Sequence, residues 1–204
     1  MPEDGKLLNR AHGAELSRQQ FSQQEYSPEE RALLLRLAHN SILSALERRA
    51  ITLDPPTPHL ADARGVFTSL YLHGHLRGCV GYIVPIYALY RAVAETACAA
   101  AFNDNRFPAV IHEEALDLAI QLSILSPPRP IGPEEIEVGC HGLLISAHGR
   151  RGLLLPQVPL EYGWDRRTFL EQTCRKAGLP IDAWQTGATI EAFTAEVFGD
   201  KVSG

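Results

Sequence analysis

Apolar and polar positions between residues 27 and 49 repeat with the period of a helix. Ser27 is a good N-cap, Pro28 suits the first helical position, and Glu30 completes a capping box. The apolar positions form one face, at Leu34, Leu37, Ala38, Ile42, Ala45 and Leu46. The pattern predicts an amphipathic helix over 27–49, and the prolines of the segment that follows predict a loop.

Two segments rich in β-branched and aromatic residues predict β-hairpins, at 65–85 and 142–158. A His-Gly pair supplies the turn in each of them. Each hairpin is followed by a predicted helix, alanine-rich at 86–102 and amphipathic at 164–179. Gly178 provides the C-terminal stop of the second helix.

The remaining segments complete a mixed fold. Alternating apolar residues predict a strand at 118–125, and the segment 188–198 is predicted to be one final strand. Prolines between them predict a rigid connector at 126–133. Because the strands cluster as hairpins and do not alternate strictly with helices, the pattern predicts an α+β fold with antiparallel sheets.

The two hairpin-helix segments resemble each other. Gly78 precedes Cys98 by 20 positions, and Gly152 precedes Cys174 by 22 positions, each pair joining a hairpin strand to the helix after it. Two similar units, derived from a duplication, explain this spacing. Convergence is a competing explanation, since hairpin turns commonly use glycine after a polar residue.

Composition and charge narrow the class of protein. The chain has 204 residues, of which 45% are hydrophobic, and a net charge of −5. A protein that binds nucleic acid through its phosphates needs a basic surface, so nucleic acid is not expected as the main partner. The sequence has no apolar stretch near the ~20 residues that span a bilayer. Residues 1–26 are predicted to be a polar tail without a signal peptide, which predicts a cytoplasmic protein.

The cysteines and histidines predict no metal site and no cofactor. The four cysteines are widely spaced, and the sequence contains no CxxC pair. No glycine-rich phosphate-binding loop occurs either.

The candidate chemistry centres on Cys79, which lies between Gly78 and Gly81. Arg77 is two residues before Cys79, so a regular strand places the guanidinium and the thiol on the same face. A cation beside a thiol stabilises the reactive thiolate. The alternative is that Cys79 is a small buried residue, and that the glycines allow close packing instead of ligand access.

Other residues could complete a site with Cys79. His141 is the best candidate for a general base, because it is flanked by glycines and an imidazole can activate a thiol; the alternative is a turn histidine bonded to the backbone. Asp104 and Arg106 could bind a polar ligand or pair with each other. Gln157 is a further candidate for ligand binding.

Four blocks of sequence occur in this order: LRGCVG, DNRFP, IEVGCHGL, and LLLPQV followed by WDRRTFLEQTCRKAGLP. They resemble blocks of the AMMECR family, in which the first block is LRGCIG. The resemblance covers roughly residues 30–200 and implies an AMMECR-like domain at 27–200. It also implies a two-lobed α+β fold with a cleft between the lobes.

The resemblance further implies an association with a Memo-like protein and a radical S-adenosylmethionine enzyme. It does not define an activity. Two hypotheses therefore remain. In the first, a cleft at LRGCVG holds a thiol-based enzyme with Cys79, Arg77 and His141. In the second, the chain is a non-catalytic binding or adaptor module that recognises a partner protein or a small ligand.

Overall fold

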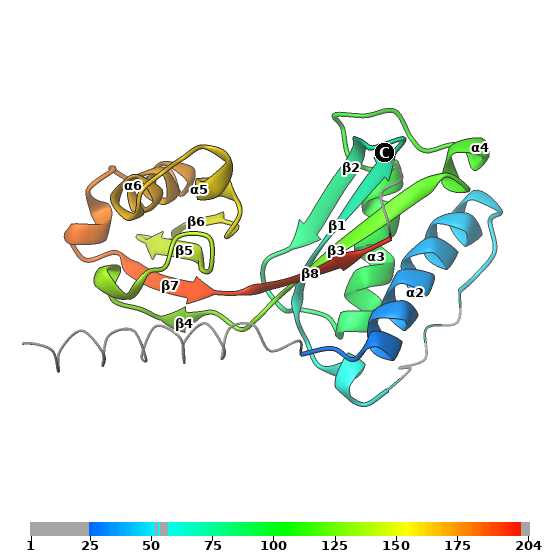
Figure 1. The fold of residues 1–204 in the computed structure, drawn as a ribbon, viewed down its shortest axis with the longest axis horizontal. Coiled ribbons are helices and arrows are strands. Elements are labelled where there is room, and N and C mark those ends of the chain that lie inside the picture. The colour runs from blue at the N-terminus through cyan, green and yellow to red at the C-terminus, as the bar shows by residue number, and fades with distance from the viewer. Residues whose placement is uncertain (1–24, 52, 54–56, 201–204) are drawn as a thin grey trace, which may run out of the picture.

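Two antiparallel sheets of four strands form the two lobes of this computed structural model, which describes residues 25–51, 53 and 57–200 (Figure 1). The strand order is β2-β1-β3-β8 in the first sheet and β4-β7-β5-β6 in the second. The strands are β1 (Gly65–Leu72), β2 (His75–Tyr82), β3 (Leu118–Leu125), β4 (Arg129–Pro130), β5 (Gly142–Ala147), β6 (Arg150–Leu154), β7 (Thr189–Phe193) and β8 (Ala195–Gly199). The helices are α2 (Pro28–Leu46), α3 (Leu89–Phe102), α4 (His112–Ala115), α5 (Val158–Glu161) and α6 (Arg166–Lys176). The predicted α+β fold class is confirmed.

The predicted start of α2 is also confirmed. The Ser27 hydroxyl accepts a hydrogen bond from the Glu30 N–H at 3.2 Å, and the Glu30 carboxylate accepts one from the Ser27 N–H at 3.1 Å. Of the expected tail, residues 1–24 lie outside the described residues. Tyr26 is buried and stacks on His59, so the chain is packed against the first lobe immediately before α2.

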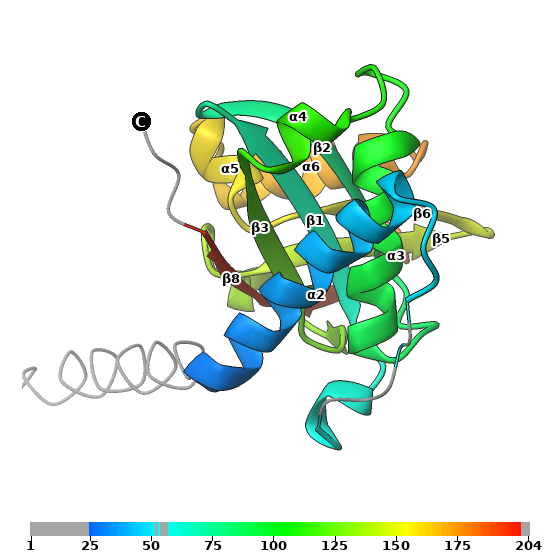
Figure 2. The same ribbon diagram turned by 90° about the vertical axis from the view of Figure 1, so that its right-hand side faces the viewer.

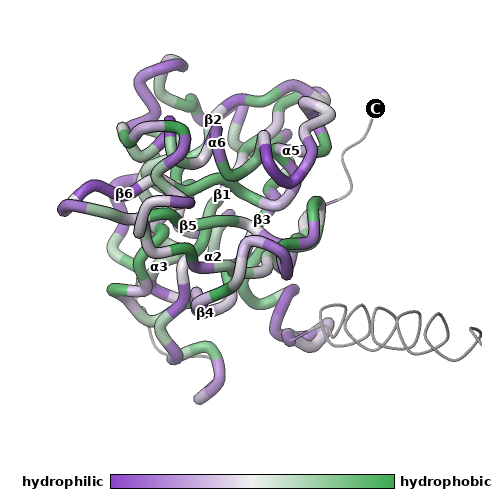
Figure 3. The backbone as a smooth tube through the Cα atoms, turned by 90° about the vertical axis from the view of Figure 1, so that its left-hand side faces the viewer, coloured by the Kyte–Doolittle hydropathy of each residue, from purple (hydrophilic) through white to green (hydrophobic). Residues whose placement is uncertain are grey.

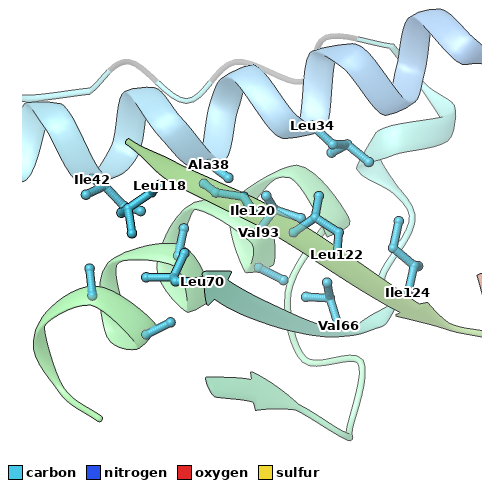
Figure 4. Packing of buried hydrophobic residues seen from close by; sticks show 14 of the residues in the cluster. Leu34, Ala38, Ile42, Val66, Leu70, Val93, Leu118, Ile120, Leu122 and Ile124 are labelled. Atoms are coloured by element: carbon cyan, nitrogen blue, oxygen red, sulfur yellow. The ribbon is translucent and has the colours of Figure 1, made fainter. Parts of the chain in front are cut away.

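Helices α2 and α3 lie together on one face of the first sheet (Figure 2). The core of this lobe is apolar and consists of side chains from both helices and from β1 and β3 (Figure 4). Its members include Leu34, Ala38, Ile42, Val66, Leu70, Val93, Ile120 and Leu122. Within this core, Thr68 and Thr96 hydrogen-bond to each other at 2.8 Å, which satisfies both buried hydroxyls.

The second lobe has a smaller core, where α6 packs on β5 and β6. Phe169, Leu170 and Cys174 of α6 are fully buried against Leu143 and Ile145 of β5. The helix ends as predicted, because Gly178 follows it with a φ of +70°.

The two predicted hairpin-helix units are built alike. Their turns have the same backbone conformation, with φ of 50° and 81° at His73 and Gly74, and 49° and 74° at His148 and Gly149. Two consecutive positive φ values are characteristic of the tight type I′ hairpin turn.

A glycine in the second strand of each unit also allows the following helix to approach closely. A Cβ atom on Gly78 would lie 2.2 Å from the carbonyl oxygen of Ala100 in α3. A Cβ atom on Gly152 would lie 2.3 Å from the backbone nitrogen of Ala177, at the end of α6. The resemblance between the units therefore extends from the turn to the packing of the helix.

The prediction of one final strand at 188–198 is wrong. The segment divides into β7, which pairs with β5 in the second sheet, and β8, which pairs with β3 in the first. Thr194 joins the two strands. The predicted connector 126–133 likewise contains the short strand β4, which pairs with β7. Alternation of apolar residues fits a strand in either sheet, so the pattern did not reveal that the chain changes sheets at Thr194.

The chain crosses between the lobes at Ser126 and at Thr194, and these two crossings are bonded to each other. The Ser126 N–H donates to the Thr194 carbonyl, and the Thr194 N–H donates to the Ser126 hydroxyl, both at 2.9 Å. Beside them, an apolar cluster joins the two sheets, and it consists of Phe67, Ile83, Leu125, Leu144, Leu153, Leu155, Phe193 and Ala195. Hydrophilic segments lie at the periphery, such as the β5–β6 turn (Figure 3).

Candidate functional site

Cys79 lies on β2, the edge strand of the first sheet, and the loop after α3 covers its backbone. The Cys79 N–H donates a hydrogen bond to the Oδ2 atom of Asp104 at 2.9 Å. The Nη2 atom of Arg106 donates to the Cys79 carbonyl at 3.2 Å. The two side chains satisfy backbone groups that a neighbouring strand would otherwise pair, which protects the edge. The LRGCVG and DNRFP segments therefore form one structure.

Asp104 and Arg106 form a bidentate ion pair. The Nε atom of Arg106 lies 2.9 Å from Oδ1 of Asp104, and its Nη2 atom lies 2.7 Å from Oδ2. The hydrogen bonds from Arg106 hold the pKa of Asp104 well below its usual range, and the Cys79 N–H adds to this effect. Asp104 is buried, whereas the Arg106 side chain is 55% exposed. The carboxylate thus fixes a guanidinium that still faces solvent.

The thiol of Cys79 is half-buried and has polar neighbours. The Ser69 hydroxyl donates a hydrogen bond to Sγ at 3.3 Å. Ser69 pairs with Cys79 on one side and with Gln121 on the other, so a thiol, a hydroxyl and an amide form a row across three strands. The hydrogen bond to Asp104 raises the pKa of Arg106. Because Arg106 also donates to the Cys79 carbonyl, the guanidinium next to Cys79 is that of Arg106.

Arg77 does not have the position that regular strand geometry predicts. Its guanidinium lies 2.8 Å from the Glu114 carboxylate and donates to the carbonyls of Pro108 and Ala109 at 2.7 and 3.3 Å. A β-bulge is the reason. Leu70 pairs with Gly78 but the next residue of β1 pairs with Leu76, so Arg77 is the extra residue and its side chain is redirected. Arg77 anchors the loop before α4.

The glycines beside Cys79 face protein atoms. At Gly78 the space that a side chain would need is filled by the backbone of Ala100. A Cβ on Gly81 would lie 2.3 Å from the ring of Phe67 and 2.6 Å from the Val66 carbonyl. Between the two alternatives, close packing and ligand access, this geometry favours close packing at both positions.

His141 and Gln157 belong to the second lobe. His141 is only 5% exposed, and its Nδ1 atom accepts a hydrogen bond from the Glu137 N–H at 3.1 Å. Burial lowers the pKa of His141, against a smaller opposing effect of Glu137 and Glu135. Gln157 is exposed at the start of α5, where its side chain makes no capping hydrogen bond.

A cavity of about 480 Å³ lies at the junction of the lobes. Its lining includes Ser126 and Thr194, where the chain crosses between the lobes, together with His141 and Phe193. Cys79 is not one of the residues that line it. The structure thus brings together Cys79, Asp104 and Arg106 at one place and puts His141 at another.

In the part of the chain that the structure describes, no three His, Cys, Asp or Glu side chains gather in a way that could hold a metal ion. Nor does any helix among those residues have the length and apolar character needed to cross a membrane.

A family model described as AMMECR1 matches residues 35–198 of the chain. The chain belongs to the AMMECR1 family. The match contains the LRGCVG, DNRFP and IEVGCHGL segments, so the resemblance expected from the sequence is confirmed.

Relatives and a solved structure agree with membership of the AMMECR1 family. A protein of Thermococcus onnurineus is 44% identical over 82% of this chain and 89% of its own length. A protein of Methanopyrus kandleri is 43% identical over 85% of this chain and 89% of its own. The crystal structure of an uncharacterised protein from Pyrococcus horikoshii has a TM-score of 0.72 and 40% identity, and the match covers 83% of this chain and 90% of that one.

Sequence reasoning missed two residues of this AMMECR1-family site. Ser69 bonds the Cys79 thiol, and pairing the two predicted strands across the His-Gly turn could have placed it opposite. Glu114 binds Arg77 from a short helix 37 residues away, and no local signal indicates that contact.

Proposed function

We propose that this chain is a binding module that recognises an anionic group at Arg106, beside Cys79. The observation that supports it is that the Arg106 guanidinium is held in position but still faces solvent. Two nitrogens of Arg106 are held by Asp104 and by the Cys79 carbonyl, whereas Nη1 makes no hydrogen bond to any residue within 25–51, 53 and 57–200. An arginine that is already ordered loses less conformational entropy when it binds a carboxylate or phosphate.

We propose a Memo-like protein and a radical S-adenosylmethionine enzyme as the partners. Membership of the AMMECR1 family supports this choice, because the family resemblance implies association with these two proteins. In this proposal, an acidic side chain or a bound anionic ligand of the partner contacts Arg106, and Cys79 contributes packing.

Replacing Arg106 by glutamine is expected to weaken capture of the partner at least about tenfold, since a charge-assisted contact is lost. Co-purification and titration of the tagged full chain with the Memo-like protein from the same genome measure this effect. Arg91→Gln is the matched control, because Arg91 is also ion-paired and its side chain is 54% exposed. Equal capture by both variants, or no capture by the unaltered chain at micromolar concentration, would overturn the proposal.

Thiol chemistry at Cys79 is the second candidate function. The Ser69 hydroxyl donates a hydrogen bond to the Cys79 Sγ atom, and Arg106 is hydrogen-bonded to the Cys79 carbonyl, so polar groups surround this cysteine. Two features place this candidate second. The Asp104 carboxylate offsets the charge of Arg106, and His141, the expected base, lines a cavity that does not include Cys79.

The rate of cysteine alkylation distinguishes the binding function from the thiol-based function. If Cys79 is a functional thiol, iodoacetamide at neutral pH should modify it at least about tenfold faster than Cys98, whose pKa is raised by burial. Mass spectrometry of the digested protein follows each site, and Cys79→Ser confirms the assignment. Rates that are equal at the two cysteines would eliminate the thiol-based function.

A further inference from the structure

The junction cavity has the size and the mixed lining of a small-molecule site. Its volume of about 480 Å³ falls in the range of roughly 300–1,000 Å³ in which proteins bind metabolite-sized ligands. Its apolar wall includes Phe193 on β7, Pro130 on β4, and Ile131 immediately after β4. This wall can accept a hydrocarbon or aromatic group of the ligand.

The charged groups of the lining are one cation and two carboxylates. Arg129 lies on β4, and Glu135 and Glu137 lie on the segment that leads to β5. Glu135 already accepts a hydrogen bond from the Gly132 N–H at 2.8 Å. Among the described residues, neither Arg129 nor Glu137 takes part in an ion pair. Charges of both signs therefore line one cavity.

His141 adds a neutral polar group to this lining. Because its Nδ1 atom accepts the Glu137 N–H, the neutral ring carries its proton on Nε2. Burial lowers the pKa of His141, so the imidazole adds no positive charge near neutral pH. The negative charge of Glu135 and Glu137 thus exceeds the positive charge of Arg129.

We propose that the junction cavity binds a zwitterionic α-amino acid with an apolar side chain. The ammonium group contacts Glu137, with support from Glu135, and the carboxylate contacts Arg129. The side chain lies on Phe193 and Ile131. A simple carboxylic acid would leave the carboxylates of the cavity unpaired, and a simple amine would leave Arg129 unpaired, so a ligand with both groups fits the lining best. This site is separate from the one at Arg106.

The test is titration calorimetry of the full chain with L-phenylalanine, and with phenethylamine and 3-phenylpropionate as probes that lack one charge each. L-phenylalanine should bind at least about tenfold more tightly than either probe. Arg129→Gln should weaken L-phenylalanine about tenfold and leave phenethylamine unchanged. Glu137→Gln should weaken both of these ligands.

A control variant separates this site from other surfaces. Arg151→Gln removes an exposed charge on β6, outside the cavity lining, and should bind L-phenylalanine normally. The inference is overturned if neither L-phenylalanine nor L-leucine binds saturably up to about 10 mM, a concentration above that of typical weak ligands. It is also overturned if a singly charged probe binds as tightly as the amino acid, or if Arg129→Gln and Glu137→Gln have no effect.

Discussion

Replacing Gly78 by alanine is expected to lower the free energy of unfolding by about 2–3 kcal/mol, because the added methyl group meets rigid backbone. The new Cβ atom would lie 2.2 Å from the Ala100 carbonyl oxygen. That oxygen belongs to α3, which is packed against β1 and α2 and has little freedom to move. Gly152→Ala should have a similar effect in the second lobe, where the new atom would lie 2.3 Å from the backbone of Ala177.

Equilibrium urea unfolding, followed by circular dichroism, measures both variants. Gly74→Asn is the control, because Gly74 has a φ of +81° that asparagine tolerates, and a Cβ atom added there would have no heavy atom within 4 Å. It should unfold within about 1 kcal/mol of the unaltered chain. If Gly78→Ala is as stable as Gly74→Asn, then α3 does not approach β2 as closely as the 2.2 Å distance requires.

Replacing Asp104 by asparagine is expected to cost about 2–3 kcal/mol at pH 7, because one carboxylate holds both the Cys79 N–H and the Arg106 guanidinium. It should also change the dependence of stability on pH. The folded pKa of Asp104 is depressed below the unfolded value of about 3.9. Its contribution is therefore fully present above pH ~4 and is lost as the pH falls toward the folded pKa.

Unfolding free energies measured between neutral and strongly acidic pH show the effect. The stability gap between the unaltered chain and Asp104→Asn should be largest at pH 7 and should narrow on acidification below pH ~4. Asp117→Asn, at an exposed carboxylate of the same lobe, should stay close to the unaltered chain throughout. A gap that keeps its size down to the lowest pH at which the chain folds would contradict the role given to the Asp104 carboxylate.

The parts of the fold that depend on near neighbours could be predicted from the sequence. The start of α2 follows from a capping box within four residues, and both hairpins follow from their His-Gly turns. The helix stop at Gly178 is equally local. These features depend on backbone conformation and on hydrogen bonds between residues close in the chain, so the sequence pattern predicts them.

The arrangement of the candidate site could be predicted only in part. The sequence identifies LRGCVG and DNRFP as candidate segments of a site. The hydrogen bonds between them join residues 25 or more positions apart, so only the three-dimensional structure shows this contact. A bulge in β2 redirects Arg77 to Glu114, and Arg106 takes the place expected for Arg77. A one-residue bulge changes the direction of a side chain but does not alter the apolar pattern of the sequence, so the pattern does not predict it.

The antiparallel pairing of β3 with β8 has a consequence for assembly of the first lobe. Leu125 and Ala195 are paired neighbours, although the whole of β4 to β7 separates them in the chain. The second lobe is therefore inserted in a hairpin, with both of its ends at one point. During synthesis, the first sheet lacks its edge strand β8 until the ribosome has made the second lobe. A folded insert with adjacent ends shortens the loop that β8 must close, which lowers the entropic cost of adding that strand.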